Sequence, residues 1–250
     1  MTEFFDWFVV TGVLIAGIGL CLHLGESVWR GGVLAGTRAR ALAAVIAVAG
    51  LLGLALLYKV EAIAKVDAEV IEGMCTSRNE KLIQLMLYIT TIGDVVPSFT
   101  IATILAVLVQ RQGVHRFAWM LLPLVVYVQT VIQFAVTKGF DDYTIADFYP
   151  DIVLGGDGTI PSGSIARLSS IFLIAACLWH ASDERRSRQL VTLGGAFLVV
   201  EAISRLYLGR HLLADIVCGL LLGLALALAA TSLVRRSATN AGSSITTNNT

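Results

Sequence analysis

Charged side chains are scarce in this sequence. The chain has 250 residues, of which 14% are charged and 56% are hydrophobic, and its formal net charge is zero. Its mean hydropathy is +0.80. Soluble domains carry about 25% charged residues, so the composition excludes soluble Rossmann and TIM-barrel enzymes. The chain also lacks the basic excess that attracts nucleic acid, which we therefore exclude as a partner.

Paired cysteines and a positive leader are also missing. The four cysteines, Cys21, Cys75, Cys177 and Cys218, form no CxxC pair, which argues against a disulfide framework or a zinc site. The first seven residues contain no Lys or Arg, whereas a signal peptide begins with a positive segment. We therefore expect the first apolar run to be a retained membrane span.

Long apolar runs make up most of the chain. A bilayer core about 30 Å thick requires roughly 20 apolar residues in each helix. Seven runs meet or approach this length: Phe8–Leu24, Ala41–Tyr58, Leu85–Gln110, Phe117–Thr137, Ser164–His180, Leu190–Leu208 and Leu212–Val234. Gly93, Asp94 and Pro97 interrupt the third run. We predict an all-α integral membrane protein with about seven transmembrane helices.

The connections between the runs alternate in charge. Arginines follow the first, third, fifth and seventh runs, whereas acidic residues follow the second and the fourth. Because basic loops stay in the cytoplasm, this predicts an N-terminus outside and a C-terminus inside. Val60–Met74 places apolar residues at helical spacing between charged ones. It predicts an amphipathic helix on the outer membrane interface.

These assignments divide the chain into three parts. Residues 1–40 hold the first span and a cytoplasmic loop. Residues 41–234 hold a core of six spans, with the outer amphipathic segment near 60–80. Residues 235–250 are rich in Ser, Thr and Asn and are predicted to form a disordered cytoplasmic tail.

Ionisable residues inside the spans mark candidate functional positions, because charge in lipid is costly. They are Asp94, Arg167, Glu201, Arg205, His211 and Asp215. Most of them fall at the outer ends of helices, and Lys138 ends the fourth run on the same side. The predicted topology therefore brings distant parts of the chain together at the extracytoplasmic face of the membrane.

The segment from Ser204 to Asp215 reads as helix, turn and helix, with Gly209 as a C-terminal cap. His211 and Asp215 are four residues apart and share a helical face. A carboxylate there can orient the imidazole and stabilise its cation, while the planar guanidinium of Arg205 suits phosphate. The alternatives are a buried pair that joins two helices and, for Arg205, an ion pair with Glu201.

The pattern S-R-x5-H-x3-D over this segment, with Pro161-Ser162-Gly163 upstream, resembles the type 2 phosphatidic acid phosphatase family of membrane lipid phosphatases. The resemblance implies a six-helix core, here with one extra N-terminal helix, and no metal or cofactor. It implies that His211 takes the phosphoryl group, Asp215 orients it and Arg205 binds phosphate. It also implies that Ser162 and Gly163 cradle phosphate and that Lys138 opens the motif K-x6-R-P.

Two departures from the family pattern bear on the substrate. Ile145 and Ala146 stand where the first motif has Arg and Pro, so Arg167 or Arg210 is a candidate replacement. Ser164 stands where the family has the histidine that protonates the leaving group, and we expect it to contact the substrate. A phosphate leaving from a diphosphate needs little acid help, because its conjugate acid has a pKa of about 6. A polyprenyl diphosphate is therefore favoured over phosphatidate.

Other functions remain as alternatives. In the leading interpretation the protein is a plasma-membrane lipid phosphatase. The two departures from the family pattern instead favour a lipid-phosphate binder without turnover, or a phosphoryl transferase. Seven helices also suit a receptor or pump, but the last run lacks the lysine that a retinal protein needs. Asp141 and Asp142 suggest a cation site, but we favour a solvated acidic loop as their explanation.

Overall fold

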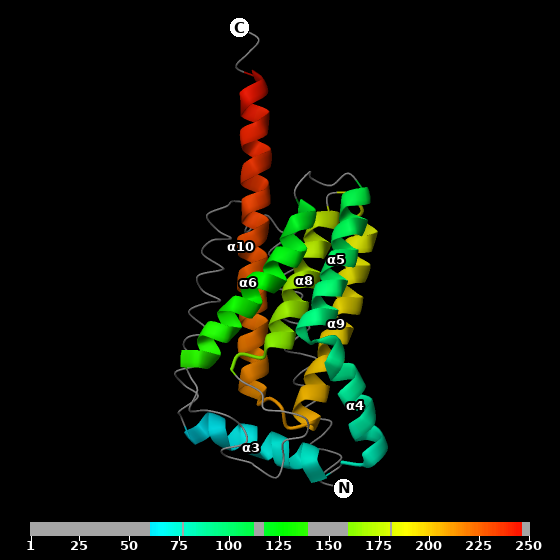
Figure 1. Cartoon of the computed structure of the whole chain (residues 1–250), viewed down its shortest axis with the longest axis vertical. Helices are drawn as coiled ribbons and strands as arrows, with labels where there is room; N and C mark the ends of the chain where they lie inside the picture. Colours follow the sequence, from blue (N-terminus) through cyan, green and yellow to red (C-terminus); the bar gives the residue numbers. More distant parts are fainter. Residues whose placement is uncertain (1–60, 77, 113–117, 140–159, 181, 247–250) are drawn as a thin grey trace.

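The computed structural model describes residues 61–76, 78–112, 118–139, 160–180 and 182–246, and its regular elements in these ranges are all α-helices (Figure 1). They are α3 (Glu61–Thr76), α4 (Glu80–Ile92), α5 (Val95–Arg111), α6 (Ala118–Gly139), α8 (Gly163–His180), α9 (Glu184–Tyr207) and α10 (Leu213–Thr246). The all-α prediction is therefore confirmed for this part of the chain. The first two predicted spans lie outside the described residues, as do Asp141, Asp142, Ile145 and Ala146.

Three of these helices, α8, α9 and α10, are long and apolar enough to cross a membrane. The helices α4 and α5 meet at a bend of 53° and make a fourth candidate when they are counted as one broken span. In α6, Met120–Val136 forms a shorter apolar helix. The protein is thus a membrane protein, while the predicted total of about seven spans and the N-out/C-in orientation stay predictions.

The central helix of the bundle is α8, which packs against α5, α6, α9 and α10. Of its 18 residues, 14 are buried, because neighbouring helices surround it. Glycines let its neighbours approach closely: a Cβ on Gly194 would lie 2.6 Å from the ring of Phe172, and one on Gly223 would lie 1.9 Å from Oγ of Ser169. Small residues serve this purpose in many membrane helix pairs.

The predicted interruption of the third run is confirmed. Helix α4 ends at Ile92 with Gly93 as its C-cap, and Asp94 precedes α5 without making a side-chain capping bond. Pro97 falls in the first turn of α5, where a missing N–H group removes no helical hydrogen bond. The break therefore leaves polar backbone groups inside the helix bundle, and these require partners.

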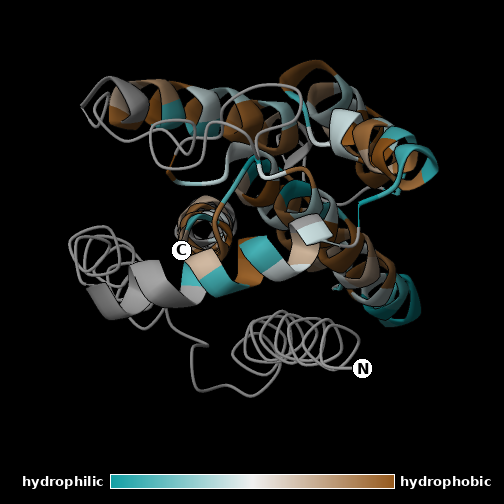
Figure 2. Ribbon diagram, turned by 90° about the horizontal axis from the view of Figure 1, so that it is seen from below, coloured by the Kyte–Doolittle hydropathy of each residue, from teal (hydrophilic) through white to brown (hydrophobic). Residues whose placement is uncertain are grey.

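Helix α3 lies across the end of the bundle where α9 ends and α10 begins (Figures 1 and 2). The predicted amphipathic helix is therefore present, and its place on the outer membrane interface stays a prediction. Val70 and Met74 are buried in one cluster with Leu206 and Ile216. Part of the apolar face of α3 therefore packs against α9 and α10.

Helix α10 continues to Thr246, which differs from the irregular tail predicted after Val234. No proline occurs between residues 235 and 246, so every residue can add one more hydrogen bond to a helix already started.

Candidate active site

A turn between α9 and α10 carries the predicted nucleophile. Leu208 caps α9, and Gly209 follows with a φ of 65°, a conformation that glycine adopts without steric penalty. The Gly209 N–H donates to the carbonyl oxygen of Leu206 at 3.0 Å. The turn reverses the chain, so that His211 lies at the end of the bundle directly before α10 begins.

His211 and Asp215 form the pair that their spacing predicts. Nδ1 of His211 lies 3.5 Å from Oδ2 of Asp215, and both side chains are buried. The same Oδ2 accepts a hydrogen bond from the Leu212 N–H at 2.9 Å, which fixes the carboxylate. Because Nδ1 faces the carboxylate, Nε2 carries the lone pair of a neutral imidazole. The geometry therefore presents Nε2 as a nucleophile.

Burial also sets the protonation state of His211, which lies in the turn outside the membrane-spanning helices. Desolvation lowers the pKa of His211 below its ordinary value of 6.5, and the positive charges of Arg205 and Arg210 act in the same direction. The Asp215 carboxylate raises the pKa and offsets only part of this shift. The imidazole is therefore neutral at pH 7, as a nucleophile must be.

The Pro-Ser-Gly-Ser turn at the start of α8 lies beside this pair. The Ser162 N–H donates to the backbone oxygen of Asp215 at 3.0 Å. Ser162, Gly163 and Ser164 are all buried. The first N–H groups of a helix lack internal partners and point toward an anion that lies at the helix end. The turn can thus receive a phosphate close to His211.

Arg205 lies near the end of α9. Its side chain contacts another residue of α9 and the break between α4 and α5. Its Nε donates to Oε1 of Glu201 at 3.0 Å, so the predicted ion pair between these residues is confirmed. Its Nη2 donates to the backbone oxygen of Thr90 at 3.0 Å and lies 3.4 Å from Oδ1 of Asp94. Asp94 is half-exposed, so an entering anion can replace it on this guanidinium.

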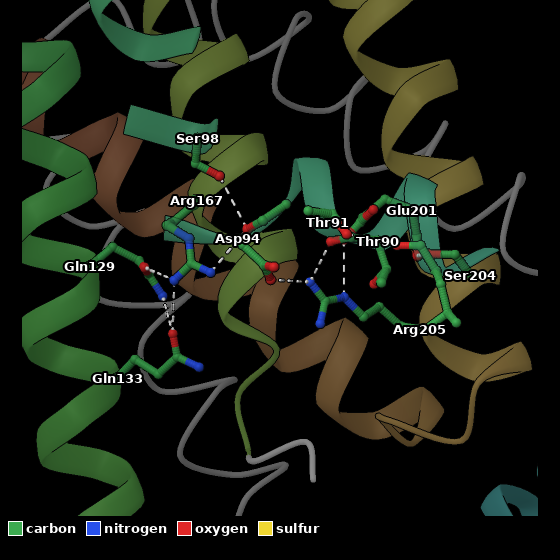
Figure 3. A network of polar contacts seen from close by, with 12 residues as sticks. Thr90, Thr91, Asp94, Ser98, Gln129, Gln133, Arg167, Glu201, Ser204 and Arg205 are labelled. Carbon is green, nitrogen blue, oxygen red and sulfur yellow. Dashed lines mark hydrogen bonds and ion pairs between the residues drawn. The ribbon is translucent and has the colours of Figure 1, made fainter. Parts of the chain in front are cut away.

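Arg167 enters the same network from α8 (Figure 3). Its Nη1 donates to Oε1 of Gln129 and of Gln133, each at 3.1 Å, and its Nη2 donates to the backbone oxygen of Gly93 at 3.0 Å. Its side chain is buried and does not extend to the membrane surface. The sequence analysis missed both glutamines, although two amides four residues apart in an apolar helix are themselves a signal of a polar interior.

Lys138 and Arg210 complete the predicted set. Lys138 is the penultimate residue of α6, and its side chain lies outside the described residues. Arg210 is half-buried in the turn before His211, and its N–H donates to the backbone oxygen of Arg205 at 3.0 Å. The structure thus brings His211, Asp215 and Arg205 close to the start of α8, with Arg167 on the other side of the break.

Buried polar atoms without a hydrogen-bond partner gather in this region. Among the described residues they include Thr90 Oγ1, Ser162 Oγ, Ser164 Oγ, Arg167 Nε and Glu201 Oε2. Nearly all buried polar groups in native proteins are paired. A concentration of unpaired ones at the end of the bundle indicates a site that binds a polar ligand.

Comparison with known families agrees with this geometry. Residues 133–238 match the model of the PAP2 superfamily. This segment carries the similarity to the PAP2 superfamily. It contains the predicted residues from Lys138 to Asp215, and the resemblance to type 2 phosphatidic acid phosphatases is confirmed. The polar partners on α4 and α5 lie outside the PAP2 segment, so part of the network comes from the preceding helices.

A solved PAP2 structure has the same fold. The chain is similar to the transmembrane PAP2-type phosphatidylglycerolphosphate phosphatase of Bacillus subtilis, with a TM-score of 0.64 and 19% sequence identity. The match covers 77% of this chain and 96% of the other. No curated protein matches the chain. At this level of identity, the likeness establishes the fold.

Proposed function

We propose that this PAP2 protein is a membrane phosphatase that removes phosphate from a lipid phosphate, with a lipid diphosphate such as a polyprenyl diphosphate as its preferred substrate. The observation that carries the proposal is the buried His211–Asp215 pair beside the start of α8 and Arg205. A neutral, oriented imidazole next to anion-binding groups is suited to phosphoryl transfer.

In the proposed reaction, Nε2 of His211 attacks the phosphorus atom and the bond to the leaving oxygen breaks. The phosphohistidine that forms is then hydrolysed by water, which releases phosphate and restores the imidazole. Asp215 stabilises the imidazolium through Nδ1. Arg205, Lys138 and the N–H groups at the start of α8 hold the phosphoryl oxygens. The proposed mechanism uses these protein groups without a metal ion.

The preference for a diphosphate follows from Ser164. A serine hydroxyl alone is a poor acid near neutral pH, and general acid catalysis contributes about 10²–10⁴-fold to a rate. An alkoxide leaving group depends on that contribution, whereas a phosphate leaving group has a conjugate acid with a pKa of about 6. A diphosphate is therefore the substrate whose turnover depends least on an acid group, and we expect it to be the faster one.

The location of the site supports a lipid as the carrier of the phosphate. The polar network lies at one end of a bundle of apolar helices, next to the broken α4–α5 pair, so a headgroup can enter while its chain stays in the bilayer. The positive-inside pattern of the loops puts this end on the extracytoplasmic side. We therefore propose the outer face of the plasma membrane as the place of reaction.

The first test is phosphate release by the purified full chain in detergent with EDTA present. A polyprenyl diphosphate and a phosphatidate are compared, with His211→Ala as the control for the nucleophile. We expect release from both in the presence of EDTA, faster from the diphosphate and lost in His211→Ala. Alkaline quenching, in which phosphohistidine is stable, with a substrate labelled in the transferred phosphate should leave label on the wild type and none on His211→Ala.

Each other result has a defined meaning. Faster release from phosphatidate would refute the leaving-group argument and keep the phosphatase. Transfer of label to an added alcohol in place of water would favour a phosphoryl transferase. Binding of both lipids without release would refute turnover and favour a lipid-phosphate binder. That alternative also fits the hydrogen bonds that Arg205 and Arg167 donate to other groups of the protein.

A further inference from the structure

The proposed reaction raises the question of what protonates the leaving oxygen. His211 is the nucleophile and Asp215 is engaged with it, so neither can donate this proton during the attack. Two other carboxyl groups belong to the described polar network. Asp94 has a side chain that is 53% exposed and lies beside Arg205, whereas the side chain of Glu201 is fully buried.

The carboxyl group of Glu201 is engaged through one oxygen only. Oε1 accepts the hydrogen bond from Nε of Arg205, but Oε2 is buried and has no hydrogen-bond partner. If Glu201 served only to hold Arg205, a two-pronged contact with the guanidinium would satisfy both oxygens. The unpaired oxygen instead leaves a position from which a carboxyl group can donate or accept a proton.

Ser164 provides a route from the Glu201 carboxyl group toward the substrate. A Cβ built on Gly93 would lie 2.3 Å from Oε1 of Glu201 and 2.6 Å from Cβ of Ser164, so the two side chains meet over Gly93. The hydroxyl of Ser164 is also buried without a partner in hydrogen-bonding geometry. Ser164 lies in the first turn of α8, directly after the turn that can receive the phosphate.

The groups that face Glu201 come from every neighbouring element. They are Arg205 on α9, Ser164 and Arg167 on α8, Asp94 in the α4–α5 break and Arg210 in the turn before α10. The Glu201 carboxyl group therefore has three guanidinium groups and one carboxylate as its charged neighbours, and Ser164 is its hydroxyl neighbour.

We propose that Glu201 and Ser164 together donate the proton to the leaving group, with Glu201 as the source and the Ser164 hydroxyl as the relay. The inference rests on the proposed phosphatase activity and names the groups that would serve as its acid. Ser164 would be the catalytic residue that contacts the leaving oxygen, and Glu201 would act through it.

The proton transfers balance over one turnover. As Nε2 of His211 bonds to phosphorus, the P–O bond breaks and its electron pair stays on the leaving oxygen. That oxygen takes the Ser164 proton, and Ser164 takes the proton of the Glu201 carboxyl group. In the second half, water attacks the phosphohistidine and its proton returns through Ser164 to Glu201. The imidazole and the carboxyl group then have their starting states.

The test compares leaving groups within one set of variants of the full chain in detergent. The substrates are phosphatidate, which releases an alcohol, and a polyprenyl diphosphate, which releases a phosphate. We expect Glu201→Gln and Ser164→Ala each to lower kcat on phosphatidate by about 10²–10⁴-fold and to lower kcat on the diphosphate by less than about tenfold. The basic limb of the wild-type pH profile on phosphatidate should be lost in both variants.

Two further variants separate the relay from structural effects. Ser164→Ala removes the hydroxyl and leaves the Glu201–Arg205 ion pair, so it carries the test where Glu201→Gln does not fold. Ser169→Ala removes a hydroxyl of α8 that donates to the backbone oxygen of Ile165, and it should leave both rates and the pH profile unchanged. Melting temperatures of all variants report on their folding.

The outcomes distinguish this inference from the proposed function. If the wild type hydrolyses both lipids but Glu201→Gln and Ser164→Ala lower both rates by the same factor, Glu201 only positions Arg205 and the relay is wrong. Unchanged rates on phosphatidate would refute it as well. If the wild type releases phosphate from neither lipid, the proposed function itself fails.

Discussion

Nη2 of Arg205 donates a hydrogen bond to the backbone oxygen of Thr90 at a distance of 3.0 Å. Arg167 makes the equivalent contact with the backbone oxygen of Gly93, also at 3.0 Å. Both carbonyl groups belong to the break between α4 and α5, where helical partners are missing. The guanidinium groups therefore stabilise the break, and the break in turn holds the arginines in place. The two form one structural unit at the end of the bundle (Figure 3).

The first prediction concerns the double role of Arg205. Arg205→Ala leaves Oε1 of the buried Glu201 carboxyl group without its hydrogen-bond donor, and an unsatisfied buried polar group costs about 1–3 kcal/mol. The double variant Arg205→Ala/Glu201→Leu removes the unsatisfied carboxyl group, so most of the lost stability should return. Phosphate release should stay at least about 10²-fold below wild type in both variants, because the phosphate has lost a charged ligand.

Thermal melting in detergent and phosphate release are the two measurements for this pair of variants. Glu201→Leu alone completes the cycle and gives the coupling energy of the pair. Recovery of activity together with stability in the double variant would contradict the assignment of Arg205 to phosphate.

The second prediction concerns the space around Gly93. A Cβ at this position would lie well inside contact distance of both Glu201 and Ser164. Gly93→Ala should therefore displace these side chains, lower the stability by about 1–3 kcal/mol and reduce phosphate release. Gly73 in α3 is the matched control, because a Cβ there meets nothing within 4 Å. Gly73→Ala should stabilise the protein by up to about 1 kcal/mol, because alanine has a higher helix propensity than glycine. The measurement is the melting temperature of each variant in detergent. Equal shifts in Gly93→Ala and Gly73→Ala would refute the packing argument.

Local sequence patterns predicted the parts of the site that lie on one segment. The spacing of His211 and Asp215, the cap at Gly209 and the Glu201–Arg205 pair each involve residues within one or two helical turns. The break at Gly93 was also predictable, because Gly, Asp and Pro occur together in an otherwise apolar run. These features depend on backbone geometry that a short window of sequence determines.

Contacts between distant segments were not predictable in the same way. The sequence marks Asp94 and Arg167 as ionisable residues in apolar runs, but their partners come from helix packing. Gln129 and Gln133 are uncharged and were overlooked, although they accept the hydrogen bonds of Arg167. The contact of Val70 and Met74 in α3 with α9 and α10 was not predictable either, because the sequence pattern is the same whether lipid or protein covers an apolar face.

The third prediction concerns the acid limb of the pH profile. His211 must be neutral to attack, and burial lowers its pKa below 6.5. The value of kcat/KM should therefore stay level as the pH falls to 6.5 and decline only at lower pH. In Asp215→Asn the raising effect of the carboxylate is lost, so the acid limb should move to still lower pH while the rate falls by about 10²–10⁴-fold. An acid limb that moves upward in Asp215→Asn would mean that a different group controls it.

The fourth prediction concerns Asp67, which connects α3 to the site. The Ala214 N–H donates to Oδ1 of Asp67 at 3.3 Å, and this side chain thereby caps the start of α10 from another helix. Burial raises the pKa of Asp67 from 3.8 to about 6, which outweighs the opposing hydrogen bond from Ala214, and the charge of Asp215 adds to the rise. The folded protein therefore binds this proton more tightly than the unfolded chain does.

This shift makes stability fall as the pH rises. The contribution of the neutral Asp67 carboxyl group is fully present below about pH 4 and is lost as the pH rises through about 6, with a total near 3 kcal/mol. Asp67→Asn keeps an oxygen acceptor for the Ala214 N–H but cannot ionise, so its melting temperature in detergent should decline less than that of the wild type between pH 4.5 and 7.5. Glu69→Gln, an exposed change on the same helix, should follow the wild type. Parallel melting curves for Asp67→Asn and wild type across this range would show that the Asp67 carboxyl group is not buried at the start of α10 in its neutral form.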